Sequence, residues 1–227
     1  MIPLWDEIPT RRLPLITIII IFINCLVYYY QFFMVVDPNT FINTYGLIPF
    51  ELTKGIALNP ATPSPIYLTI LFSMFMHGGL VHLLGNMLYL WIFGNNVEDY
   101  LGKIRFLIFY ILSGIFAAFA QILMAPGSKV PMIGASGAIA GVLGAYLILF
   151  PRARITTLVF FGFFIRLIKL PAIFVLGLWI IFQLFYGLSE LSISGGGAGV
   201  AWFAHIGGFM GGIILIKLFS PRKHNYY

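Results

Sequence analysis

The stretch IGASGAIAGVLGAYLILF, residues 133–150, decides the fold class of this chain. It carries no charge over a length of about 27 Å as a helix, close to the bilayer core of about 30 Å. Its glycines at positions 137, 141 and 144 recur at helical spacing. Small residues at such spacing let membrane helices approach closely. The stretch therefore predicts a membrane-spanning helix that packs tightly against another helix.

The composition extends this prediction to the whole chain. Of 227 residues, 60% are hydrophobic, while 13 are basic and 7 are acidic. Soluble domains carry about 25% charged residues, so this chain has too few charges to cover a water-exposed surface. The single Cys25 excludes a disulfide framework. The N-terminus has no short apolar region followed by a cleavage site, so the first apolar segment is expected to remain as an anchor.

Apolar runs predict an all-α membrane protein, a bundle of six transmembrane helices over residues 13–219, because backbone polar groups in lipid must be satisfied internally. The runs are Leu13–Val36, Leu80–Gly94, Ile104–Met124, Ile133–Phe150, Pro171–Leu188 and Val200–Phe219. Residues 1–12 precede the bundle and residues 220–227 follow it as a tail. Tyr67–Met76 is too short to span. The segment at about 155–168 has basic residues at both ends and is expected to be interfacial or re-entrant.

The basic residues predict the orientation in the membrane. With six spans, eleven Lys and Arg residues fall on the side of the termini, and only Lys54 and Lys129 fall opposite. The positive-inside rule then makes both termini cytoplasmic. The loop at about 37–66 and the Ser194–Gly199 hinge lie outside. Since the basic residues are scattered over short loops, the charge of +6 does not indicate nucleic-acid binding.

The predicted spans hold His82, Asn86, Ser136 and His205, polar residues at positions where polar groups are expensive. Counted from the cytoplasmic ends of their helices, Ser136 lies at a depth of about 21 Å, and His82 and His205 at about 18 Å. Asn86 lies one turn below His82 on the same helix face. The shared depth places Ser136 and His205 where they can meet.

The chemistry that fits these residues is a serine hydroxyl activated by a histidine base. His82, Asn86 and the Ser136 backbone N–H are the candidate donors to an oxyanion. All carboxylates lie outside the spans or at their ends, which excludes aspartyl intramembrane chemistry and speaks against cation-coupled transport. A His-Glu-x-x-His zinc motif is missing, and no cofactor or metal is implied. The competing interpretation is that Ser136 and Asn86 only join helices by hydrogen bonds.

Three motifs resemble those of the rhomboid intramembrane serine proteases of the prokaryotic six-span type. They are HGGLVHLLGNMLYLWIFG at 77–94, GASG at 134–137 and AHIGG at 204–208, in the order of the family. The YGLIP stretch at 45–49 in the outside loop also matches. The resemblance covers nearly the whole chain, and the combination of the three motifs is highly specific.

The resemblance implies Ser136 as nucleophile and His205 as general base, with His82 and Asn86 helping to hold the oxyanion. It includes His77 without a defined role, and it implies that Glu98 fixes a cytoplasmic helix end. Ala140 stands where some members carry an aromatic ring on the catalytic histidine, so Trp202 or packing is expected to orient His205.

The same resemblance implies transmembrane proteins as substrates, cut near small or helix-breaking residues, within a lipid bilayer that is the inner membrane of a prokaryotic cell. Two alternatives stay open. One is a catalytically inactive rhomboid-like protein that binds membrane clients, and the other is a small-solute transporter. The sequence indicates neither the physiological substrate nor the oligomeric state.

Overall fold

The computed structural model describes residues 1–161, 164–192 and 200–220. The expected hinge at Ser194–Gly199 and the tail beyond residue 220 lie outside these described residues. The described chain is mostly helical, and each predicted span corresponds to a helical segment.

The first two predicted spans each continue through a π-helical turn. Helix α1 (Leu15–Tyr29) runs into η1 (Tyr30–Met34). Helix α5 (Leu80–Tyr89), η2 (Leu90–Gly94) and α6 (Asn95–Leu101) follow one another without a break. This segment stops at Gly102, whose φ of 78° lies in the left-handed region that ends helices. The second helical segment is therefore longer than the apolar run that predicted it.

The remaining spans correspond to α7 (Lys103–Met124), α8 (Ser136–Leu149), α9 (Ala172–Ser192) and α10 (Trp202–Phe219). Four helical stretches in the described chain are long and apolar enough to cross a membrane: Leu15–Met34, Lys103–Met124, Ala172–Leu191 and Trp202–Phe219. Helix α8 is apolar but has only 14 residues. The chain is thus a membrane protein with four candidate spans by length and composition, two fewer than predicted.

The prediction of an all-α fold is wrong at one end of the molecule. Strands β1 (Ile2–Asp6), β2 (Arg154–Phe161) and β3 (Phe164–Pro171) form an antiparallel sheet in the order β1-β2-β3. The segment expected to be interfacial or re-entrant is thus a β-hairpin that pairs with the N-terminal segment. A short apolar run cannot be assigned to helix or strand by periodicity alone. Here β-branched and aromatic residues favour the strand.

The predicted outside loop contains two short helices, α2 (Pro38–Tyr45) and α3 (Pro49–Lys54). Each begins with a proline, which suits the first helical position because the missing N–H has no partner there. The short apolar segment after the loop holds α4 (Leu68–Ser73), whose 6 residues agree with the expectation that it does not span.

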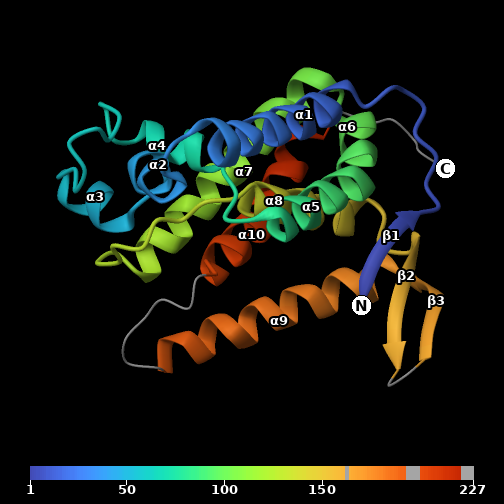
Figure 1. Cartoon of the computed structure of the whole chain (residues 1–227). Helices are drawn as coiled ribbons and strands as arrows, with labels where there is room; N and C mark the ends of the chain where they lie inside the picture. Colours follow the sequence, from blue (N-terminus) through green and yellow to red (C-terminus); the bar gives the residue numbers. More distant parts are fainter. Residues whose placement is uncertain (162–163, 193–199, 221–227) are drawn as a thin grey trace.

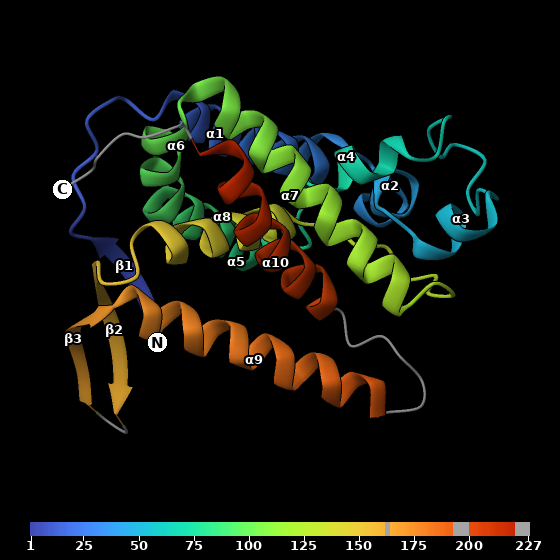
Figure 2. The same ribbon diagram turned by 180° about the vertical axis from the view of Figure 1, so that it is seen from behind.

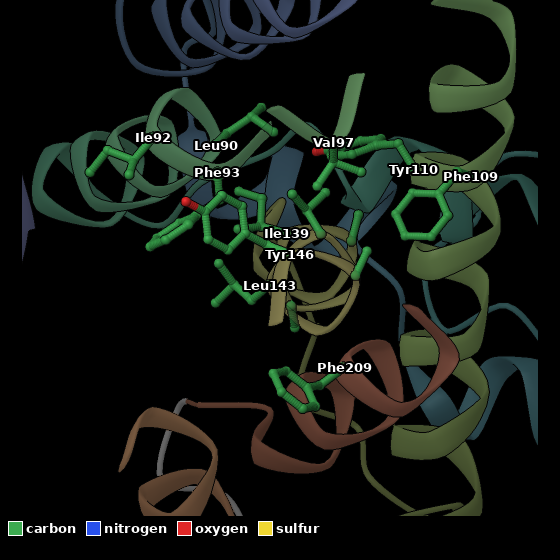
Figure 3. Packing of buried hydrophobic residues seen from close by; sticks show 14 of the residues in the cluster. Leu90, Ile92, Phe93, Val97, Phe109, Tyr110, Ile139, Leu143, Tyr146 and Phe209 are labelled. Atoms are coloured by element: carbon green, nitrogen blue, oxygen red, sulfur yellow. The ribbon is translucent and has the colours of Figure 1, made fainter. Parts of the chain in front are cut away.

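The elements are arranged between two ends (Figure 1). The sheet lies at one end, and α2, α3 and α4 lie at the other. Helix α10 packs against both α7 and α8, and the view from behind shows α9 running along one side of the bundle, directly after β3 (Figure 2). The buried aromatic rings of Phe93, Tyr146 and Phe209 belong to one continuous apolar core (Figure 3).

The paired glycines of α10 explain its central position. A Cβ at Gly208 or Gly212 would overlap the backbone carbonyl of Gly137 or Gly141 on α8. A Cβ at Gly207 would overlap Ala120 on α7. One glycine of each pair therefore faces α8 and its neighbour faces α7. This close approach brings the short side chain of the serine on α8 within reach of α10.

Candidate active site

Ser136 is the first residue of α8, three residues later than the predicted start of this span. The helix cannot begin earlier because Gly134 has a φ of 126° and its N–H donates to the carbonyl of Ser73 (2.9 Å). The first N–H groups of a helix have no partner within the helix. The backbone N–H of Ser136 is therefore in a position to bind an anion.

The loop before Ser136 is fixed by the segment between α2 and α3. Leu47 and Met132 exchange backbone hydrogen bonds of 3.1 and 2.7 Å, and the N–H of Phe50 donates to the carbonyl of Ser128 (2.9 Å). The YGLIP stretch thus holds the chain that leads to the serine.

His205 lies in the first turn of α10, opposite the start of α8. Its Nε2 atom is 2.8 Å from Ser136 Oγ, a hydrogen-bond distance. The structure thus brings together the two residues that were placed at a similar depth from the sequence. The contact depends on the glycine faces of α8 and α10, because larger residues there would separate the helices.

His82 and Asn86 line the same cavity of about 400 Å³ as Ser136 and His205. The Nδ2 atom of Asn86 is buried and has no hydrogen-bond partner among the described residues. The Nδ1 atom of His82 accepts a long hydrogen bond from the N–H of Gly78 (3.4 Å), which leaves Nε2 as the protonated nitrogen. That Nε2 lies against Gly134, where a Cβ would come within 2.8 Å of it. Among the described residues, two side-chain N–H donors at the cavity are thus left without an acceptor.

His77 lies behind this site. It is fully buried, and its ring packs edge-on against His82 with 5.0 Å between the ring centres. Its carbonyl accepts a hydrogen bond from Gln31 Nε2 on η1 (2.9 Å). The contacts of His77 therefore support the position of the His82 ring.

Gln183 on α9 is the residue that the sequence analysis missed. Its Oε1 atom lies 2.7 Å from His205 Nδ1, on the side of the ring away from the serine. The expected Trp202 does touch His205, edge-on at 6.3 Å between ring centres, and Trp179 lies at 5.9 Å. Ala140 is fully buried and provides no ring. The available signal was an amide side chain within the apolar run at 171–188.

The buried carboxylate of Glu98 lies far from this cavity. It accepts hydrogen bonds from the N–H groups of Ile16 (2.9 Å) and Thr17 (2.7 Å) at the start of α1. Among the residues that the structure describes, no three His, Cys, Asp or Glu side chains gather in a way that could hold a metal ion. The site itself offers a hydroxyl, an imidazole base and unpaired N–H donors, which are the groups needed for acyl transfer.

Comparison with known proteins places the chain among rhomboid proteins. The family described as Rhomboid domain matches residues 66–222. Rhomboid protease GluP of Bacillus subtilis is 32% identical over 182 residues, which cover 80% of this chain and 31% of that protein. The mitochondrial Rhomboid protein 1 of Saccharomyces cerevisiae is 31% identical over 156 residues, covering 65% of this chain and 40% of that protein.

A human relative, the mitochondrial Presenilin-associated rhomboid-like protein, is 35% identical over 88 residues, covering 38% of this chain and 23% of that protein. The chain spans less than half the length of each of these relatives. The family match nevertheless covers more than half of the chain and contains His82, Asn86, Ser136 and His205. The chain belongs to the rhomboid family.

Proposed function

We propose that this chain is an intramembrane serine endopeptidase that cleaves peptide bonds in or beside transmembrane segments of other membrane proteins. The observation that carries the proposal is the 2.8 Å contact between Ser136 Oγ and His205 Nε2. The contact lies in a cavity that His82 and Asn86 also line. The bacterial relative named as a rhomboid protease supports the same activity.

In the first half of the proposed reaction, Ser136 Oγ attacks the carbonyl carbon of the scissile peptide while its proton passes to His205 Nε2. The electron pair of the carbonyl moves onto its oxygen. When the tetrahedral intermediate collapses, the C–N bond breaks and the imidazolium gives its proton to the leaving nitrogen. A water molecule then cleaves the acyl ester by the same route and returns the proton to Ser136.

The oxyanion needs donors that are already in place. Asn86 Nδ2 is buried without a partner, and it is proposed to donate to the oxyanion together with His82 Nε2 and the Ser136 N–H. Such donors act mainly in the transition state, so their contribution is expected in kcat. The substrate helix must unwind locally, because its backbone hydrogen bonds otherwise occupy the scissile carbonyl.

The proposed setting is a multi-pass protein with six spans over residues 13–219, in the cell membrane of a prokaryote. The two spans beyond the four candidates would be helix α8, which is shorter, and the Leu80–Leu101 segment, which is less apolar. In the described chain, strands β2 and β3 at the sheet end carry Arg154, Arg166 and Lys169, whereas Lys54 ends α3 at the other end (Figure 1). The positive-inside rule supports a cytoplasmic sheet end, and both termini are proposed to lie on the cytoplasmic side.

The test is cleavage of a single-span test substrate by the purified chain in proteoliposomes, with wild type, Ser136→Ala and the control Ser189→Ala. Ser189 is on α9, and its hydroxyl donates to the carbonyl of Phe185 (2.7 Å). We expect cleavage and labelling by a fluorophosphonate for wild type and Ser189→Ala, and neither for Ser136→Ala. Equal cleavage by Ser136→Ala would refute the mechanism. A wild-type protein that binds the substrate without cutting it, and resists the label, would instead be a client-binding protein.

A further inference from the structure

Gln183 is a polar side chain on α9 that has no role in the reaction as proposed so far. Gln183 is only 7% exposed, whereas its neighbours Phe182 and Leu184 face outward. An amide in the apolar surroundings of a membrane helix is expensive unless its hydrogen bonds are made. Both ends of this amide are paired. Its Nε2 donates to the carbonyl of Trp179 one turn earlier (3.3 Å), and its Oε1 lies 2.7 Å from His205 Nδ1.

These two contacts fix which nitrogen of His205 carries a proton. Only the NH₂ group of an amide can donate to the Trp179 carbonyl, so the oxygen of the amide must face the histidine. An amide oxygen can only accept a hydrogen bond, so His205 Nδ1 must be the protonated nitrogen. In a neutral imidazole the other nitrogen is then an acceptor. This nitrogen is Nε2, which lies against the Ser136 hydroxyl.

We propose that Gln183 is a positioning residue that holds His205 in the Nδ1–H tautomer and aims its Nε2 lone pair at Ser136. The inference rests on the function proposed above. The rings of Trp179 and Trp202 both lie near the imidazole ring, at 5.9 and 6.3 Å between ring centres. An indole N–H only donates hydrogen bonds, so neither tryptophan ring can accept the Nδ1 proton. Ser136, His205 and Gln183 thus form a chain of hydrogen bonds from α8 through α10 to α9.

The neutral amide distinguishes this arrangement from a serine, histidine and carboxylate triad. In such a triad the carboxylate both selects the tautomer and stabilises the imidazolium that forms. An amide oxygen selects the tautomer and orients the ring but contributes only a dipole toward the developing charge. A carboxylate at the same place would keep the acceptor, whereas an alkyl side chain of similar size would remove it.

Two substitutions therefore separate positioning from packing. Gln183→Glu keeps an acceptor for Nδ1 but places a carboxylate in an apolar contact, which lowers thermal stability. Gln183→Leu keeps the volume and suits the apolar surroundings but leaves Nδ1 without its acceptor. A positioning role predicts higher kcat for Gln183→Glu than for Gln183→Leu. A packing role predicts the reverse order. The matched control is Ser189→Ala, which removes an equivalent bond to a carbonyl one turn earlier on α9 without touching the histidine.

The experiment uses the full chain in detergent and measures kcat, KM and the melting temperature for these variants on the same single-span test substrate. General acid and base catalysis contributes about 10²–10⁴-fold, and Gln183→Leu is expected to lose about 10²-fold in kcat because the base remains but is no longer oriented. KM should stay unchanged. Gln183→Glu should retain more kcat than Gln183→Leu despite a lower melting temperature, and Ser189→Ala should match wild type.

A second measurement does not depend on activity. Nitrogen NMR of histidine-labelled protein, assigned by comparison with His205→Ala, should show a protonated Nδ1 in wild type and a mixture of tautomers in Gln183→Leu. A protonated Nε2 in wild type, or unchanged kcat in Gln183→Leu, would overturn the inference. If Ser136→Ala cleaved like wild type, the proposed function would fail instead, while the tautomer measurement would still report on Gln183.

Discussion

At the scale of single residues, the site contains a side-chain N–H donor that makes no hydrogen bond within the described structure. Asn86 Nδ2 is buried in the wall of the cavity without a partner among the described residues. A buried unpaired donor costs free energy, about 1–3 kcal/mol. An unpaired donor in the wall of a cavity is expected where it donates to a group of the bound substrate and not to another group of the protein.

We predict that Asn86→Ala lowers kcat by about 10²–10³-fold, the usual effect of losing one oxyanion donor, with KM little changed. The melting temperature should hardly fall, because Nδ2 has no hydrogen bond to lose in the described structure. Steady-state cleavage and a melting curve of the purified variant test both points. A variant that melts early but cleaves at the wild-type rate while folded would make Asn86 a structural residue.

At the scale of elements, the N-terminal strand is tied to the helix that carries the serine. Asp6 Oδ2, at the end of β1, accepts hydrogen bonds from Tyr146 on α8 and from Asn96 on α6, both at 2.6 Å. Burial raises the pKa of Asp6 above its ordinary value, although the hydrogen bond from Tyr146 acts in the opposite direction. The folded state therefore binds the Asp6 proton more tightly than the unfolded state.

This shift predicts a pH dependence of stability. The stability that protonated Asp6 adds is present in full below its unfolded pKa, near pH 4, and is lost as the pH rises through the folded pKa. Asp6→Asn keeps an acceptor oxygen without the charge. We expect its melting temperature, relative to wild type, to increase between pH 4 and pH 7 in detergent. A difference that stays constant over this range would contradict the assignment.

The contact between α8 and α10 gives a second prediction at this scale. A Cβ at Gly212 would meet the backbone of Gly141, which cannot move aside as a side chain can. Gly212→Ala is expected to lose about 1–3 kcal/mol of stability, typical of overpacking, and to slow labelling of Ser136 by a phosphonate. The matched control is Gly177→Ala on α9, where a Cβ meets nothing within 4 Å. This variant should melt at or slightly above the wild-type temperature.

At the scale of the whole molecule, both described chain ends lie at the sheet end. Asn96 on α6 bonds Asp6 of β1, and Tyr100 on the same helix bonds Ser220 (3.2 Å), just after α10. The β2–β3 hairpin belongs to this end as well, because β2 pairs with β1. The sheet end therefore gathers the N-terminal strand, the hairpin and the end of the last described helix.

The prediction concerns the side of the membrane on which these parts lie. In a Cys25→Ser background, single cysteines at positions 152 and 169 should react with an impermeant maleimide from the same side, and a cysteine at position 129 from the opposite side. Sealed vesicles of known orientation provide the measurement, and permeabilised vesicles are the control. Labelling of positions 152 and 169 from opposite sides would refute the proposed topology.

The sequence by itself determined that the chain is a membrane protein of the rhomboid family, because apolar length, scarce charge and three spaced motifs are local properties. It also indicated Ser136, His205, His82 and Asn86, since polar residues are rare inside apolar runs. Tertiary structure decided what depends on partners distant in the chain. Residues 154–171 form strands β2 and β3, and β2 pairs with β1 from the far end of the sequence. Gln183 has a partner in His205 only because α9 packs beside α10. An amide in an apolar helix is a local signal, but which group it faces is set by the packing of two helices.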